Sequence, residues 1–237
     1  MNFVITMAGL GKRFIDSGYI QPKYLIKVKN KTLLEWSVNS LPLNLSTKIT
    51  FAILKSHNDK FNVVETIKKI YGHLNINFCI IEKVTRGQLE TVLKCWNYID
   101  KTKKLLIFNI DTKFNSQSLE YNLKKKCDGL VGTFNSNQSR FSYAKVNDNA
   151  VTETAEKKVI SNIALSGLYM FSDPYLFYEI GNNYIFQKKT TKSEYYIAPI
   201  YNDLIKIKKK IIIDEVDNID ILGTPEELDQ FKNNELY

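Results

Sequence analysis

The chain has 237 residues, 44% of them hydrophobic, and a formal net charge of +8 from 33 lysines and arginines against 25 aspartates and glutamates. This length fits one domain with a sizeable core, and the composition is that of a globular protein. The basic residues are scattered in short runs, so we expect no nucleic-acid partner. The opening apolar run is too short for a signal peptide or a membrane span, and three well-separated cysteines favour a reduced, cytoplasmic protein without a membrane partner.

Apolar runs typical of buried strands alternate with amphipathic runs along the first 135 residues. The predicted strands are 3–7, 49–54, 76–81, 104–110 and 129–134, and the predicted helices between them are 32–41, 58–70, 88–99 and 118–126. This alternation implies a mostly parallel sheet with helices on both faces, and ligands at the carboxyl ends of the strands.

The rest of the chain is more broken. The predicted elements are a hairpin formed by 142–146 and 151–154, strands at 163–171 and 210–216, and helices at 174–181, 197–208 and from 224 onward. Thr224 and Pro225 are typical of a helix start. We therefore predict an α/β fold: a single Rossmann-like domain over residues 1–237, whose mostly parallel mixed sheet is covered by helices on both faces, with a small β-rich portion.

A glycine loop follows the first predicted strand. Gly9 and Gly11 allow the backbone to turn sharply and to bring its N–H groups close to a ligand, and Lys12 and Arg13 add positive charge. This combination favours phosphate binding, although a plain β-turn remains an alternative. The loop is neither a Walker A motif nor a dinucleotide fingerprint, because Phe14 stands where a third glycine is needed.

Three further positions are candidates for ligand binding. Lys23 follows Pro22, which fixes a turn and can direct the lysine toward the glycine loop. Asp111 ends a predicted strand, where a carboxylate commonly meets Mg²⁺ and phosphate oxygens. Gly87 and Gln88 open a helix, and the glutamine amide can donate to and accept from a base edge. An ordinary turn and an ordinary helix start remain the simpler alternatives for Asp111 and Gln88.

Taken together, these segments resemble the sugar-nucleotide pyrophosphorylase, or nucleotidylyltransferase, family. Its A-G-x-G-x-R loop, P-K pair, G-Q step and metal aspartate are matched by 8–13, 22–23, 87–88 and Asp111. Its E-K pair, G-x-Y-x-F strand, E-Y-Y segment and closing G-T-P-E-D-L are matched by 156–157, 167–171, 194–202 and 223–228. The motifs keep the family's order over almost the whole chain.

The resemblance implies roles for particular residues. Catalysis would use Arg13, Lys23 and Lys12. The nucleotide would be bound by Ala8, Gly9, Gly11, Gly87, Gln88 and Asp111. The acceptor would be bound by Glu156, Lys157, Gly167, Glu194 and Tyr195. Residues 1–135 would then be mainly the NTP-binding half, and 136–237, with the β-rich portion, mainly the acceptor-binding half.

The resemblance also implies Mg²⁺, held by Asp111 and by a second carboxylate two residues before the closing Gly-Thr pair. This sequence has Ile221 there. Side chains alternate faces along a strand, so Asp217 shares the face of position 221, whereas the nearer Asp220 would need a bulge. We expect one of the two to be the second metal ligand and favour Asp217.

The implied activity is nucleotidyl transfer from an NTP, with CTP favoured, to a small phosphorylated acceptor. The short chain and the run 87–93 resemble capsule-associated cytidylyltransferases, including phosphoglutamine cytidylyltransferase. Alternatives are a sugar-1-phosphate nucleotidyltransferase that uses UTP or dTTP, a GT-A-like glycosyltransferase, and a non-catalytic nucleotide sensor. The base, the acceptor and the oligomeric state, including a homodimer, stay open.

Overall fold

The computed structural model describes residues 1–233, so the last four residues of the predicted domain lie outside the described part. The strands are β1 (Asn2–Met7), β2 (Lys27–Val28), β3 (Lys31–Thr32), β4 (Lys48–Leu54), β5 (Ile76–Ile81), β6 (Leu105–Asn109), β7 (Thr112–Asn115), β8 (Gly129–Asn135), β9 (Ser142–Asn147), β10 (Ala150–Glu156), β11 (Ile163–Phe171), β12 (Ile211–Glu215) and β13 (Asn218–Ile221). The helices are α1 (Lys12–Asp16), α2 (Leu33–Val38), α3 (Lys55–Phe61), α4 (Val63–Tyr71), α5 (Gln88–Lys94), α6 (Leu119–Lys124), α7 (Pro174–Phe186), α8 (Ile200–Lys206) and α9 (Pro225–Asn233), with 3-10 turns at Lys23–Leu25, Leu43–Leu45 and Trp96–Tyr98.

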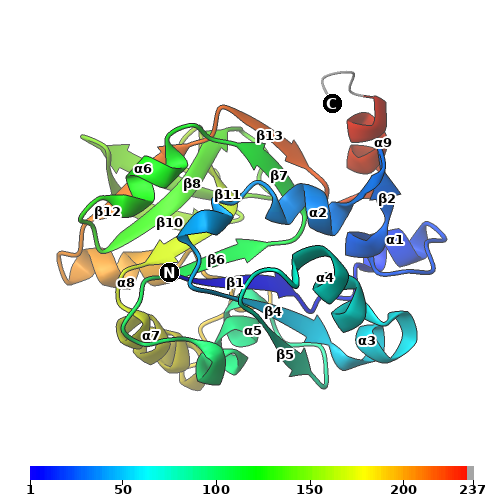
Figure 1. Ribbon diagram of the computed structural model, residues 1–237. Helices are drawn as coiled ribbons and strands as arrows, with labels where there is room; N and C mark the ends of the chain where they lie inside the picture. The colour runs from blue at the N-terminus through cyan, green and yellow to red at the C-terminus, as the bar shows by residue number, and fades with distance from the viewer. Residues whose placement is uncertain (234–237) are drawn as a thin grey trace.

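The central sheet has the order β5-β4-β1-β6-β11-β8-β12-β10-β9. Its first four strands are parallel, which follows from the βαβ connections of the first half of the chain. Antiparallel β11 joins this part to the second half, where β12 lies parallel to β8. Helices flank the sheet on both faces (Figure 1), which confirms the predicted α/β fold with a mixed sheet.

The strand side chains alternate between two buried layers. Phe3 and Ile5 of β1 pack in one layer with residues of α2, α4 and α6, whereas Val4 packs in the other with residues of α5, α7 and α8. Leu106 and Leu105 of β6 divide between the layers in the same way. This arrangement explains why these strands are continuous apolar runs in the sequence, because both of their faces are covered.

One predicted helix is two helices. The segment expected at 58–70 divides into α3 and α4 at Asn62, whose φ of 50° is left-handed. Asn58 does not begin the helix; it lies within α3, and its side-chain oxygen accepts from the Val64 backbone N–H at 3.0 Å, near the start of α4. The apolar spacing persists across the break, so periodicity alone cannot reveal it.

The last helix returns to the first part of the chain. Leu228 and Phe231 of α9 pack in a small cluster with Phe14 and Leu33, and Figure 1 shows α9 beside α1, α2 and β2. The predicted cap is present, since the Glu227 N–H donates to Thr224 Oγ1 at 3.3 Å. Helix α9 therefore packs against α1, the helix that follows the glycine loop.

Cys79 and Cys95 are buried, as expected for core thiols, and Cys127 is half-buried; all three are free. Within residues 1–233, every helix is too short or too polar to cross a bilayer.

Candidate active site

Two adjacent hollows lie at the carboxyl ends of β1 and β6. The first, of about 500 Å³, is lined by the glycine loop, Lys23 and residues 84–88, and is called the loop hollow here. The second, of about 290 Å³, is lined by residues 140–142 and 156–157 of the β9–β10 hairpin region and is called the hairpin hollow. Side chains shared by both hollows mark their boundary: Gln88, Asn109, Asp111 and Tyr196. The site therefore has two compartments that meet at the end of β6.

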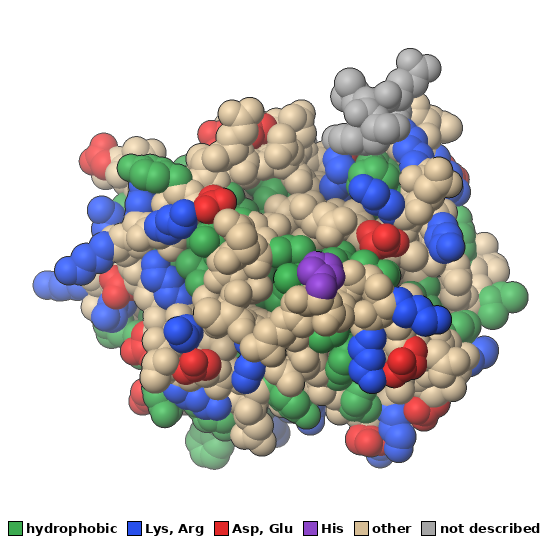
Figure 2. Space-filling view, viewed as in Figure 1, with side chains coloured by type: hydrophobic (Ala, Val, Ile, Leu, Met, Phe, Trp, Pro, Cys, Tyr) green, Lys and Arg blue, Asp and Glu red, His purple; other side chains and the backbone are tan. Residues whose placement is uncertain are grey.

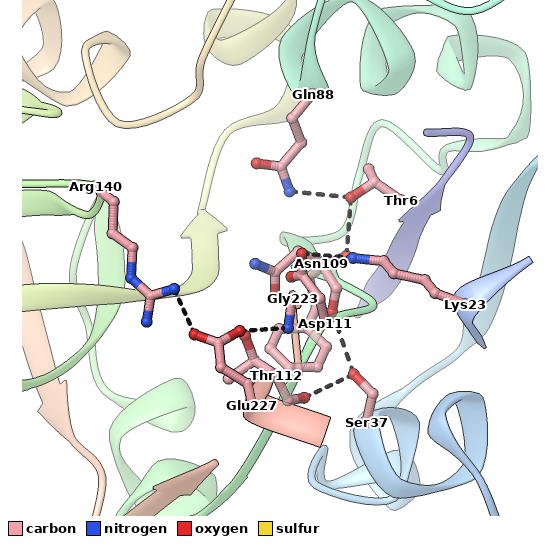
Figure 3. A network of polar contacts seen from close by, with 11 residues as sticks. Thr6, Lys23, Ser37, Gln88, Asn109, Asp111, Thr112, Arg140, Gly223 and Glu227 are labelled. Atoms are coloured by element: carbon pink, nitrogen blue, oxygen red, sulfur yellow. Dashed lines mark hydrogen bonds and ion pairs between the residues drawn. The ribbon is translucent and has the colours of Figure 1, made fainter. Parts of the chain in front are cut away.

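Asp111 and Lys23 are paired with each other at this boundary. Lys23 Nζ lies 2.7 Å from Asp111 Oδ2, with 17% of the lysine and 32% of the aspartate side chain exposed (Figure 3). The Asp111 carbonyl oxygen accepts from the Leu222 N–H at 2.7 Å, which fixes its backbone. The sequence placed both residues in one site, and the geometry brings them into direct contact.

The glycine loop lies over the Lys23 side chain. Gly11 has a φ of +67° at the start of α1, and a Cβ on it would lie 3.7 Å from Lys23 Cγ. Ala8, Gly9 and Lys12 line the loop hollow, whereas the next residue, Arg13, lines the hairpin hollow. Because α1 begins at this point, successive basic side chains point toward different compartments.

The Gln88 amide is already engaged. Gln88 Nε2 donates to Thr6 Oγ1 at 3.0 Å, and Thr6 Oγ1 donates to the Phe108 carbonyl oxygen at 3.2 Å (Figure 3). Gly87 precedes it with a φ of +133°, and a Cβ there would lie 2.4 Å from the Tyr195 carbonyl oxygen. Only glycine permits this close approach, which anchors the start of α5 against the chain at Tyr195.

Three predicted acceptor residues line the hairpin hollow: Glu156, Lys157 and Gly167. Glu156 accepts a hydrogen bond from Ser142 Oγ, and burial raises the pKa of its carboxyl. Gly167 has a φ of +87°, and a Cβ on it would lie 2.2 Å from Asn109 Nδ2. The glycine thus makes room for the Asn109 side chain at the boundary of the hollows.

The E-Y-Y segment is arranged differently from the prediction. Glu194 lines the loop hollow rather than the hairpin hollow, and Tyr195 is only 2% exposed and packs in the core. The Arg86 guanidinium lies 5.0 Å from the centre of the Tyr195 ring. The following residue, Tyr196, lines both hollows. Its position has no local sequence signal, because it depends on the packing of this segment against Gly87.

Asp217 and Asp220 line neither hollow, which corrects the expected second metal ligand. Asp217 accepts from the Gln117 N–H at 2.9 Å, and Asp220 pairs with Lys113 at 3.0 Å. The parity argument assumed one continuous strand, but β12 ends at Glu215 and a new strand, β13, begins at Asn218. In β13 it is Ile221 that lines the hairpin hollow.

A second charged contact, missed by sequence reasoning, closes the hairpin hollow. Arg140 pairs with Glu227 Oε1, and Glu227 Oε2 accepts from the Gly223 N–H at 2.9 Å (Figure 3). This contact ties the β8–β9 connection to the start of α9. The pairing of residues so far apart in the chain carries no local sequence signal.

Two carboxylates, those of Asp111 and Glu227, lie beside Gly223 at the wall of the hairpin hollow. Within residues 1–233, no three histidine, cysteine, aspartate or glutamate side chains group to hold a metal ion. A Cβ on Gly223 would lie 3.7 Å from Asp111 Oδ2 and 3.4 Å from Glu227 Oε2, so the two carboxylates approach the same point. Mg²⁺ commonly keeps several waters and takes one or two carboxylates together with phosphate oxygens. Asp111 fits such an ion once Lys23 moves away from it.

Comparisons with known proteins agree with this architecture. A nucleoside-diphosphate-sugar pyrophosphorylase from Vibrio cholerae RC9 is 29% identical, with a TM-score of 0.86 over 98% of this chain and 100% of that one. An inositol-1-phosphate CTP transferase from T. maritima is 13% identical, with a TM-score of 0.75 over 95% and 90% of the two chains. An apo UDP-glucose pyrophosphorylase is 18% identical, with a TM-score of 0.78 over 98% and 96%.

Curated proteins gave no match to the chain. The nucleotidyl transferase family, by contrast, matches residues 3–211, which include the glycine loop, Asp111 and the lining of both hollows except Ile221, Gly223 and Glu227. This match covers most of the chain, and the neighbours of known structure share the arrangement of its sheet. The chain therefore belongs to the nucleotidyl transferase family.

Proposed function

We propose that the chain transfers a nucleoside monophosphate from an NTP, with CTP favoured, to a small phosphorylated acceptor and releases pyrophosphate. The observation that carries this proposal is the meeting of two hollows at Asp111 and Lys23. A triphosphate in the loop hollow and an acceptor in the hairpin hollow would place their phosphates side by side at this boundary. Positioning two reactants in this way is a large part of catalysis for such a reaction.

In the proposed step, an acceptor phosphate oxygen bonds to the α-phosphorus, the bond from that phosphorus to the β-bridging oxygen breaks, and pyrophosphate leaves with the electron pair. Gly9 and Gly11 would bring backbone N–H groups to the triphosphate. Lys12 and Lys23 would balance its charge within the loop hollow, and Arg13 would add positive charge from the hairpin hollow, which is what electrostatic catalysis requires. Asp111 would hold Mg²⁺, which lowers the repulsion between the anions when it is bound.

The acceptor would lie in the hairpin hollow. Lys157 would bind its phosphate, and Glu156 would accept hydrogen bonds from the remainder of the molecule. Glu194, which lines the loop hollow, would lie on the nucleotide side of the boundary. Residues 1–135 would then supply most of the nucleotide site and 136–237 most of the acceptor site.

The choice of CTP rests on the resemblance to compact cytidylyltransferases, with phosphoglutamine as one acceptor and capsule precursor synthesis as the setting. It is supported by the fold shared with the inositol-1-phosphate CTP transferase. A second candidate, a sugar 1-phosphate with UTP or dTTP, is favoured by the 29% identity to the Vibrio pyrophosphorylase. The free thiols are consistent with our proposal of a cytoplasmic location.

A nucleic-acid partner is not proposed, since Figure 2 shows lysines and arginines spread among acidic side chains on the face in view.

The test of the proposed function is a grid of reactions. CTP, UTP, dTTP, ATP and GTP are each incubated with sugar 1-phosphates, phosphocholine and phosphoglutamine in the presence of Mg²⁺, and released pyrophosphate is measured. We expect release that requires both substrates. Sugar transfer from an intact nucleotide sugar without pyrophosphate would instead show a glycosyltransferase.

A further inference from the structure

Tyr196 lines both hollows and has no role in the chemistry proposed above. Its hydroxyl accepts a hydrogen bond from Lys157 Nζ, and the same Nζ lies 4.6 Å from the centre of its ring. The tyrosine therefore contacts the ammonium group through its hydroxyl, at the edge of the ring. Such a contact fixes a flexible side chain that would otherwise sample many rotamers.

The backbone before Tyr196 is held by a tight turn. Thr191 and Glu194 exchange two backbone hydrogen bonds of 3.0 Å. The two residues between them, Lys192 and Ser193, both have left-handed backbones, with φ values of 48° and 66°. This is the pattern of a tight hairpin turn with left-handed central residues. The turn sets the direction of the backbone that leads to Tyr196.

The residue next to Tyr196 is anchored to the nucleotide side of the site. The Tyr195 N–H donates to the Arg86 carbonyl oxygen at 2.8 Å, and its carbonyl oxygen accepts from the Leu89 N–H at 3.1 Å. The missing Cβ of Gly87 permits this close packing. Tyr196 thus projects from a segment whose backbone is bound to the start of α5.

Lys157 is also fixed at its backbone. Its φ of 54° is uncommon for a residue with a side chain, and its N–H donates to the Phe141 carbonyl oxygen at 3.1 Å. A left-handed backbone outside glycine persists only where neighbouring contacts hold it. The starting point of the lysine side chain is therefore fixed, and the Tyr196 hydroxyl fixes its end.

The Tyr196 hydroxyl is the acceptor in this contact, because an ammonium group can only donate hydrogen bonds. Burial, and after it the nearby Glu194 carboxylate, raises the pKa of Tyr196. The hydroxyl therefore holds the end of the Lys157 side chain at the boundary of the two hollows.

We propose that Tyr196 is a positioning residue whose hydroxyl holds the Lys157 ammonium at the boundary of the two hollows. The proposal rests on the proposed function, in which Lys157 binds the acceptor phosphate. It implies that the loss of the hydroxyl weakens use of the acceptor far more than use of the nucleotide.

The first arm of the test is kinetic. Tyr196→Phe keeps the ring and removes the hydroxyl, so we expect the KM for the acceptor to rise about tenfold, as for the loss of a hydrogen bond to a charged group, while the KM for the NTP stays nearly constant. In a Lys157→Met background the same change should have no further effect, because Tyr196 acts through that lysine. Tyr184→Phe, which removes a half-buried hydroxyl bonded to the Pro199 carbonyl oxygen outside both hollows, is the matched control.

The second arm does not need turnover. Binding of inorganic phosphate to the nucleotide-free protein is titrated for the wild type, both single variants and the double variant. We expect weaker binding in Tyr196→Phe and no additional loss in the double variant relative to Lys157→Met. Equal phosphate affinity in all four proteins, or additive effects of the two changes, would overturn the inference. If no substrate pair gave turnover, the proposed function would fail and this titration would still decide the role of Tyr196.

Discussion

Asp111→Asn should separate the catalytic role of this carboxylate from its role in the fold. The substitution keeps the shape of the side chain and removes the charge that faces Lys23 at 2.7 Å. Because the pair is partly exposed, its loss should lower the free energy of unfolding by less than about 1 kcal/mol. For a domain of this size, that corresponds to a decrease in Tm of at most about 2–4 °C. The backbone bond from Leu222 to the Asp111 carbonyl oxygen is unaffected.

The expected effect on turnover is much larger. The carboxylate is the group at the boundary of the hollows that could hold Mg²⁺, and losing one contact that stabilises the transition state typically lowers the rate by about 100- to 1,000-fold. Pyrophosphate release at saturating substrates measures this effect, and a circular dichroism melt measures the stability. Near-normal turnover in a folded Asp111→Asn protein would refute the assignment.

Asp220→Asn is the matched control. It changes the same residue type in an ion pair of similar length, 3.0 Å to Lys113, but outside both hollows. That pair is more buried, with 11% and 17% of the two side chains exposed. We therefore expect Asp220→Asn to lower stability more than Asp111→Asn and to leave turnover nearly unchanged. A large loss of turnover in a folded Asp220→Asn protein would instead mean that Asp220 belongs to the site.

Three further predictions concern the walls of the site. Gly87→Ala should unfold at a lower temperature by thermal melting, because its Cβ would meet a backbone oxygen at 2.4 Å, whereas Gly9→Ala, with no atom within 4 Å, should melt like the wild type. Burial raises the pKa of the Glu156 carboxyl above its ordinary 4.5, so the folded state binds this proton more tightly and loses stability as pH rises from about 4.5 through the raised pKa. Denaturant unfolding of Glu156→Gln should show a stability advantage over the wild type that grows across this range; a constant difference would contradict it. Glu227→Gln, at a carboxylate 12% exposed, should destabilise the protein by about 1 kcal/mol in the same assay, and Asp229→Asn, at an ion pair with 63% of the aspartate exposed on the same helix, by much less.

Much of the fold follows from local pattern. The strands 3–7 and 49–54 are buried on both faces, so they appear as apolar runs that the sequence displays directly. The edge strand 76–81 is only partly buried, but its run is also apolar enough to be recognised. The two-stranded ribbon of β7 and β13 could not be found in this way. Each of its strands has four residues, which is too short for alternation to stand out, and they pair across about a hundred residues.

In the candidate site, too, some features could be predicted from the local sequence and others could not. The glycine loop and Asp111 are visible because a strand end followed by glycine or carboxylate is a local signal. The choice between Tyr195 and Tyr196 was not visible, because it depends on the packing of this segment against Gly87. The ion pair of Arg140 with Glu227 joins distant parts of the chain, and only the fold brings them together.

The most direct test of the central claim is ³¹P NMR of a reaction that contains the protein, Mg²⁺, an NTP and a phosphorylated acceptor. If two phosphate compounds meet at Asp111 and Lys23, the spectra should show pyrophosphate together with a new diphosphate that joins the nucleoside monophosphate to the acceptor, in equal amounts. Inorganic phosphate with a nucleoside diphosphate, or an unchanged spectrum for every substrate pair in the grid, would contradict the account.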